Sequence, residues 1–156
     1  MIREELLHPA VSHFPIAFLF LSLGLKIAIV VFKQNQLQTS YKLLLYLGTA
    51  FILPTLFLGD MALDIVKTKA CRLDLIHEHE ELGEQTLYFF IGAILMEMAI
   101  MATPMAKYIK KIFLDCFILL ILGCGCFFLF ETAEHGAELV YDQGVAVKRE
   151  MGDCPK

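Results

Sequence analysis

Histidines suited to binding a metal ion or haem iron lie near the ends of long apolar stretches in this chain. His8 and His13 precede the first stretch, and His135 follows the fourth. His77 and His79 precede the third stretch. Carboxylates lie nearby along the chain: Asp60, Asp64, Glu80, Glu81, Glu84, Glu131, Glu134 and Glu138. Imidazole and carboxylate together are typical ligands of transition metals.

The composition is that of a membrane protein. Of the 156 residues, 58% are hydrophobic and 19% are charged, and the mean hydropathy is +0.65. Soluble domains are about half apolar and roughly a quarter charged. The net charge of −4 and the absence of a basic block argue against a nucleic-acid partner.

Apolar stretches of the right length predict four membrane spans. A helix needs about 20 mostly apolar residues to cross the hydrocarbon core of a bilayer. We expect spans at about 14–32, 43–59, 87–103 and 112–130. The predicted fold is therefore an all-α, integral membrane four-helix bundle. It forms a single domain over residues 1–156 with a short polar C-terminal tail, with the lipid bilayer as its surroundings and its oligomeric state left open.

Four spans place both ends of the chain on one side of the membrane, together with the loop at 60–86. All the histidines are then expected at that end of the bundle. The links on the other side contain lysines and no acid: Lys33, Lys42, Lys107, Lys110 and Lys111. The termini side has more basic residues in total, namely Arg3, Lys67, Lys69, Arg72, Lys148, Arg149 and Lys156, so the positive-inside rule is nearly balanced. The lysine links are short and contain no acid, which favours a cytoplasmic location for them. We therefore expect a bacterial inner-membrane protein with periplasmic termini.

Three charged residues lie within the predicted spans: Asp115 near the start of the fourth, and Lys26 and Glu97 deeper in the first and third. Lys26 and Glu97 are each expected about 20 Å from the termini-side surface, at 1.5 Å per helical residue. Either charge alone would cost roughly 3 kcal/mol at mid-helix, which favours an ion pair between them. The alternative is that Lys26 extends its side chain toward Lys33 and the nearer surface.

The start of the first span predicts how its histidines lie. Ser12 is a suitable N-cap, which makes His13 the first helical residue and Pro15 a tolerated first-turn proline. His13 would then face the mouth of the bundle. His8 precedes Pro9 and is expected in a less constrained, extended lead-in.

Helical spacing also orients the other histidines. His79 shares a stripe with apolar and small residues, so it should point into the bundle, and His77 should point to the solvent rim. His135 shares a face with Glu131 and Glu138. Gly136 is expected to end this last helix.

Four motifs carry a resemblance to a known family: HPAVSHFPIA, LGDMALD, HEELG and EHGAELVYDQGVAV. Over about 7–147 the chain resembles domain-of-unknown-function family 2231, largely bacterial four-span membrane proteins. The resemblance directs attention to His8, His13, Asp60, His79, His135, Gly136, Tyr141 and Gly144. The chain departs from the family at Ala137, where a second glycine is common, and at Gln143, where a histidine is common. Relatives occur beside or fused to cytochrome-type domains, which implies redox chemistry.

Three functions are compatible with these residues, and we favour the first, a redox centre with haem ahead of a non-haem metal. The first is a b-type haem centre for electron transfer to a redox partner protein or a quinone. His13 and His79 are its expected axial ligands, with His135 and His8 as further candidates, and Gly83 and Ala17 would leave room for the macrocycle.

The second function is a non-haem site for iron, zinc, manganese or copper. Its expected ligands are His13, His79, His135 and Asp60. The third is a structural or carrier role without a cofactor. No Ser or Cys lies beside a histidine and an orienting acid in evident register, so whether the protein is an enzyme is left open. Cys71 and Cys154 share one side and could form a disulfide if that side is oxidising.

Overall fold

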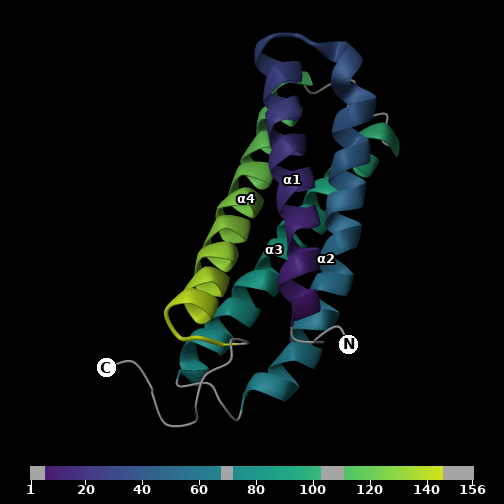
Figure 1. Ribbon diagram of the computed structural model, residues 1–156. Helices are drawn as coiled ribbons and strands as arrows, with labels where there is room; N and C mark the ends of the chain where they lie inside the picture. The colour runs from purple at the N-terminus through teal and green to yellow at the C-terminus, as the bar shows by residue number, and fades with distance from the viewer. Residues whose placement is uncertain (1–5, 68–71, 103–110, 146–156) are drawn as a thin grey trace.

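The structure, a computed structural model, describes residues 6–67, 72–102 and 111–145. These residues are mostly helical and contain no β-strand, which confirms the predicted all-α class. Figure 1 shows the long helices arranged as a bundle. They are α1 (Leu7–Val31), α2 (Gln38–Val66), α3 (Leu73–Ala102) and α4 (Lys111–Tyr141), with the short 3-10 helix η2 (Asn35–Leu37) between α1 and α2.

The long helices run alternately up and down. The starts of α1 and α3 and the ends of α2 and α4 lie at the lower end in Figure 1, which we call the termini-side end; the upper end is the opposite end. α1 packs mainly against α2, and α3 mainly against α4. Smaller contacts of α1 with α4 and of α2 with α3 close the bundle. Thus α1 and α3 lie on one diagonal and run in the same direction.

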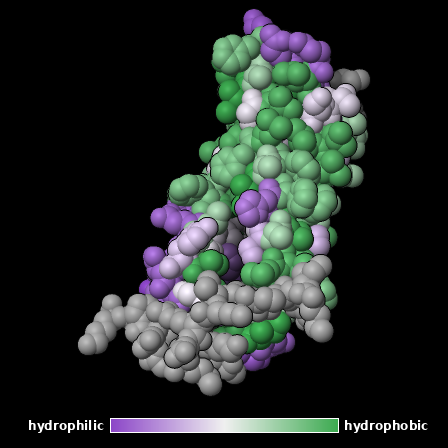
Figure 2. Space-filling model, viewed as in Figure 1, coloured by the Kyte–Doolittle hydropathy of each residue, from purple (hydrophilic) through white to green (hydrophobic). Residues whose placement is uncertain are grey.

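The outer surface is suited to lipid. Each of the four described long helices is long and apolar enough to cross a membrane. Large hydrophobic side chains are exposed along all of them, among them Leu21, Leu53, Leu95 and Leu120. In Figure 2 hydrophobic residues cover most of the upper and middle part of the visible face, with hydrophilic residues at the upper tip and toward the lower end. The chain is an integral membrane protein, as its composition predicts.

α1 and α3 begin earlier than the apolar stretches predicted. α1 begins at Leu7 rather than near Phe14, and α3 begins at Leu73 rather than near Leu87. Their added turns contain polar residues, among them His8 and Ser12 in α1 and Asp74 and His77 in α3. Helix formation does not require apolar residues where the chain leaves the hydrocarbon core. The helical segments therefore exceed the predicted spans and carry the histidines on regular helix rather than on loops.

The predicted helix cap at Ser12 is wrong. Because α1 already begins at Leu7, Ser12 lies inside the helix, where its hydroxyl donates to the carbonyl of Pro9 at 2.9 Å. Pro9 is compatible with this early start, since the first turn of a helix needs no backbone N–H donor. His13 is therefore not the first helical residue, and its direction differs from the expected one.

The predicted helix end at Gly136 is also wrong. α4 continues through Gly136 to Tyr141. A left-handed backbone conformation follows at Gly144, where φ is 65°. Gly136 has a different role, described below.

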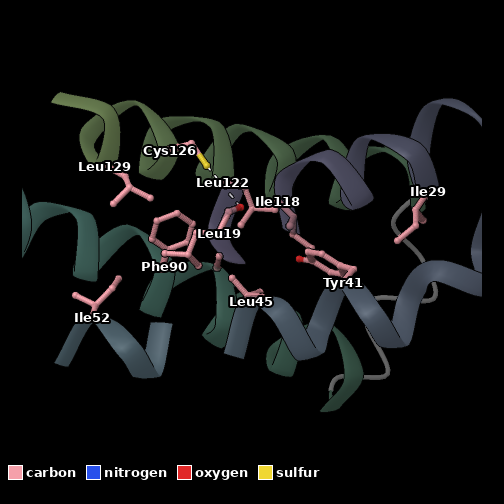
Figure 3. Packing of buried hydrophobic residues seen from close by; sticks show 11 residues of the cluster. Leu19, Ile29, Tyr41, Leu45, Ile52, Phe90, Ile118, Leu122, Cys126 and Leu129 are labelled. Atoms are coloured by element: carbon pink, nitrogen blue, oxygen red, sulfur yellow. Dashed lines mark hydrogen bonds between the residues drawn. The ribbon is translucent and has the colours of Figure 1, made fainter. Parts of the chain in front are cut away.

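An apolar cluster fills the inside of the bundle (Figure 3). Its buried members are Leu19, Ile29, Tyr41, Leu45, Ile52, Phe90, Ala93, Ile118, Leu122, Cys126 and Leu129. Two glycines bring the helices close together. A Cβ at Gly48 would lie 2.6 Å from Cγ of Leu19, and one at Gly125 would lie 3.1 Å from Cζ of Phe90. Small residues at such positions allow close helix contacts in membrane proteins.

The two deeper intramembrane charges are paired. Nζ of Lys26 lies 3.0 Å from Oε1 of Glu97, and both side chains are buried. This confirms the ion pair and excludes the alternative in which Lys26 extends toward Lys33. A third residue, Asp115, also binds Lys26, at 2.9 Å.

Candidate functional site

Two histidines from diagonally opposed helices meet at the termini-side end. The ring centroids of His8 on α1 and His79 on α3 are 5.9 Å apart, and the ring planes are inclined at 86°. Both residues are partly buried. We call these two residues the histidine pair.

The other two helices hold the rings in place. Nδ1 of His8 donates to the carbonyl of Thr55 on α2 at 2.8 Å, and Nδ1 of His79 donates to the carbonyl of Thr132 on α4 at 2.9 Å. A carbonyl oxygen only accepts, so each Nδ1 carries the hydrogen and each neutral ring keeps a lone pair on Nε2. A backbone carbonyl on the non-coordinating nitrogen is the usual way in which proteins orient metal-binding histidines.

A glycine lies against each ring. A Cβ at Gly59 would be 3.2 Å from Nδ1 of His8, and one at Gly136 would be 3.1 Å from Cε1 of His79. Side chains at these positions would push the rings from their carbonyl partners. This explains Gly136 as a packing position for His79 rather than a helix end.

His135 lies nearby on α4 with the same tautomer. Its Nδ1 donates to the carbonyl of Glu131 at 2.9 Å, and its Nε2 is 3.7 Å from a carboxylate oxygen of Glu78. It lines a surface pocket together with Glu78, Glu81, Leu82, Gln85 and Glu131. The three histidines His8, His79 and His135 form what we call the termini-side site.

His13 does not meet His79. Its side chain is exposed, and its Nδ1 donates to the carbonyl of Pro9 in its own helix at 2.6 Å. His13 is five residues after His8, which turns it about 140° around α1 at 3.6 residues per turn. Because α1 begins before His8, the helix directs His8 inward and His13 outward.

The remaining candidates lie at the rim. His77 is exposed and bonds Glu80 at 3.2 Å, while His79 points inward, so the predicted orientation of these two histidines is confirmed. Asp60 is exposed. Tyr141 is 84% exposed. Cys71 and Cys154, the predicted disulfide partners, lie outside the described residues.

The described parts of the chain contain no group of three or more His, Cys, Asp or Glu side chains positioned to hold a metal ion. The histidine pair is thus a two-ligand arrangement, with His135 and Glu78 next to it. The three histidines of the termini-side site were candidates from sequence, but Thr55, Gly59 and Thr132 were not. Thr55 and Thr132 act through their backbone carbonyls and Gly59 through its lack of a side chain, so none has a recognisable sequence signal. The position of His8 had a signal, because it lies seven residues before Pro15 on the buried stripe of α1.

Comparison with known proteins gives one match. A family model described as "Predicted membrane protein (DUF2231)" matches residues 5–149. No curated protein and no solved structure matches the chain.

Proposed function

The chain belongs to the predicted membrane protein family DUF2231, and we propose that it binds a transition-metal ion in the membrane through the imidazoles of His8 and His79. The observation that carries the proposal is the histidine pair itself. Two rings from different helices lie close together, nearly perpendicular, and each is oriented by a carbonyl of a further helix. An ordinary buried histidine needs no such four-helix arrangement.

The donor chemistry supports a borderline metal ion. Neutral imidazole suits zinc, copper, iron and nickel. The distance from zinc to an imidazole nitrogen is about 2.0–2.1 Å. His135 supplies a third imidazole, and Glu78 supplies a carboxylate beside it. Binding of the ion would draw His135 toward the pair and complete a three-histidine site.

The packing favours an ion over a haem. Gly83 and Ala17 are the small residues expected from sequence to leave space for a macrocycle. A Cβ at Gly83 would lie 3.2 Å from the side chain of Leu56, and Ala17 is exposed. Gly59 and Gly136 accommodate the histidine rings themselves rather than a porphyrin. The residues around the pair therefore do not fit a haem.

Bound copper or iron would give the protein a one-electron centre, whereas bound zinc or manganese would make it a metal store or carrier. Only with copper or iron would the protein have a redox partner, either a protein or a quinone.

We further propose a bacterial inner membrane location with the site on the periplasmic side. Support comes from Lys33, Lys42 and Lys111, which lie at the opposite end of the bundle, where the positive-inside rule favours the cytoplasm.

The test is metal binding by the detergent-purified protein after treatment with a chelator. Calorimetric titration with Zn²⁺ and Cu²⁺, and the visible spectrum with Co²⁺, should report one site with nitrogen ligands. His8→Ala and His79→Ala should each weaken binding by about 100-fold or more, since even residues that only orient a ligand contribute 10–100-fold. His13→Ala is the matched control, because it removes an imidazole from the same helix end and should bind like the wild type.

Three results of the same experiment would contradict the proposed metal site. If His13→Ala abolishes binding while His8→Ala does not, the pair expected from sequence is the true one. A Soret band in the protein as purified would replace the ion with a haem. Wild-type protein that binds none of the three ions would end the proposal.

A further inference from the structure

A second polar cluster lies near the opposite end of the bundle. Lys26 of α1 contacts Glu97 of α3 at 3.0 Å and Asp115 of α4 at 2.9 Å. Lys42 of α2 lies 3.5 Å from the second carboxylate oxygen of Glu97. All four long helices therefore contribute one charge each, and two ammonium groups balance two carboxylates. We call these four residues the charge cluster.

The charge cluster is graded from buried to exposed. The side chains of Lys26 and Glu97 are 1% and 6% exposed, and that of Asp115 is 16% exposed. Asp115 also lines a surface pocket with Lys33, Asn35, Lys111 and three apolar residues. A single carboxylate thus touches both the aqueous pocket and the buried ammonium group.

The hydroxyl of Tyr41 lies beside the charge cluster. The Tyr41 side chain is fully buried and interacts with Glu97. Figure 3 shows this hydroxyl pointing into the interior, away from Ile29. Nζ of Lys26 lies 5.0 Å from the centroid of the Tyr41 ring. Glu97 therefore has a buried hydroxyl near it as well as two ammonium groups.

We propose that the charge cluster is a proton-exchange site open to the side of the membrane opposite the termini. Asp115 takes a proton from water in the pocket and becomes a neutral acid. Lys26 then gives one of its protons to Glu97 and receives the proton of Asp115. The net result is a protonated Glu97, an ionised Asp115 and one added positive charge on the cluster.

The charged groups around each carboxylate are cationic, which favours its ionised form, so a proton taken up from water passes on rather than staying on Asp115. Asp115 faces Lys26 on α1, with Lys33 and Lys111 in the same pocket, while Glu97 faces Lys26, Lys42 and Tyr41. Each carboxylate keeps a cationic neighbour when Lys26 exchanges its protons. Toward the termini-side site the way is closed by Leu19, Leu45, Phe90 and Leu122, which are all fully buried and apolar. The cluster therefore loads protons from one side only.

The test is infrared spectroscopy of the full chain in vesicles of phosphatidylcholine and phosphatidylglycerol. Lowering the pH protonates the exposed carboxylates as well, so the site is measured in the difference between the spectra of the wild type and Glu97→Gln. This difference should contain one C=O band of a carboxylic acid, which shifts when water is replaced by D₂O. Asp115→Asn should keep it and slow its exchange by roughly 100-fold, the smaller of the usual effects of a positioned proton-transfer group. Asp60→Asn, an exposed carboxylate at the other end, is the control and should exchange like the wild type.

Several results would overturn the proposal. Identical acid bands in the wild type and Glu97→Gln, at every pH where both stay helical, would do so because Glu97 would then take up no proton. The proposal would also fail if the acid band of Asp115→Asn exchanged its hydrogen at the wild-type rate. Slower exchange in Lys42→Gln than in Asp115→Asn would show that the proton enters by way of Lys42 instead. Metal binding by Asp115→Asn should equal that of the wild type, so failure here and failure at the histidine pair are distinguishable.

Discussion

At the scale of single residues, Lys26 is the residue on which the buried charges depend. Its ammonium group holds two carboxylates from two other helices, and its own side chain is 1% exposed. Lys26→Met keeps a similar shape but leaves Glu97 with only the more distant Lys42. We expect a loss of about 3–5 kcal/mol in the free energy of unfolding, because a buried charge without its partner is strongly destabilising. Unfolding in detergent by titration with dodecyl sulfate, followed by circular dichroism, measures this loss.

The double variant Lys26→Met/Glu97→Gln separates charge from shape. It removes one charge of each sign, so part of the stability should return, but not all of it, because Asp115 loses its contact with Lys26 and Lys42 its contact with Glu97. A double variant as unstable as the single one would show that the loss comes from the missing Lys26–Glu97 contact rather than from an unpaired buried charge.

At the scale of the helices, two close approaches hold the pairs α1–α2 and α3–α4 together. We expect Gly48→Ala to destabilise the protein by about 1–3 kcal/mol, because the added methyl would overlap Leu19 at 2.6 Å and push α1 from α2. Gly24→Ala on α1 is the control, since its Cβ would meet nothing within 4 Å. The control should be neutral or gain up to about 1 kcal/mol from the better helix propensity of alanine. Thermal unfolding of both variants in the same detergent decides this, and equal losses would contradict the close packing at Gly48.

At the scale of the whole molecule, the histidine pair and the charge cluster form two layers across the bundle. The two layers are separated by the same number of residues on α1 and on α3. Lys26 follows His8 by 18 residues on α1, and Glu97 follows His79 by 18 residues on α3. At 1.5 Å per residue the layers are about 27 Å apart, close to the roughly 30 Å of a hydrocarbon core. The histidine pair and the charge cluster therefore lie near opposite faces of the bilayer.

The same arrangement predicts the topology. Fusions of alkaline phosphatase or a fluorescent protein after Tyr141 and before Leu7 should report the same side of the membrane, since four helices cross it. A fusion within the link at 33–36 should report the other side. With the orientation proposed above, phosphatase is active at both ends of the chain and fluorescence appears only at the link. Opposite signals from the two ends would contradict a four-span protein, and the reverse pattern at all three sites would invert the proposed orientation.

The sequence alone determines the class of the molecule and the ends at which its chemistry lies. Long apolar stretches dictate membrane helices, since a backbone in lipid must bond to itself, and an even number of spans places all histidines at one end. The inward direction of His79 also follows from sequence, because the buried stripe of α3 continues through it. The pairing of Lys26 with Glu97 follows from the cost of isolated charges in a membrane.

Only the tertiary structure decided which groups meet. The direction of His8 and His13 depends on where α1 begins, and a few residues of difference in that start exchange the inward histidine for the outward one. The carbonyl partners at Thr55 and Thr132 and the inclusion of Asp115 and Lys42 depend on the rotation and height of each helix against its neighbours. Those are set by close packing at contacts such as Gly48 with Leu19, which link residues far apart in the chain and leave no periodic trace in it.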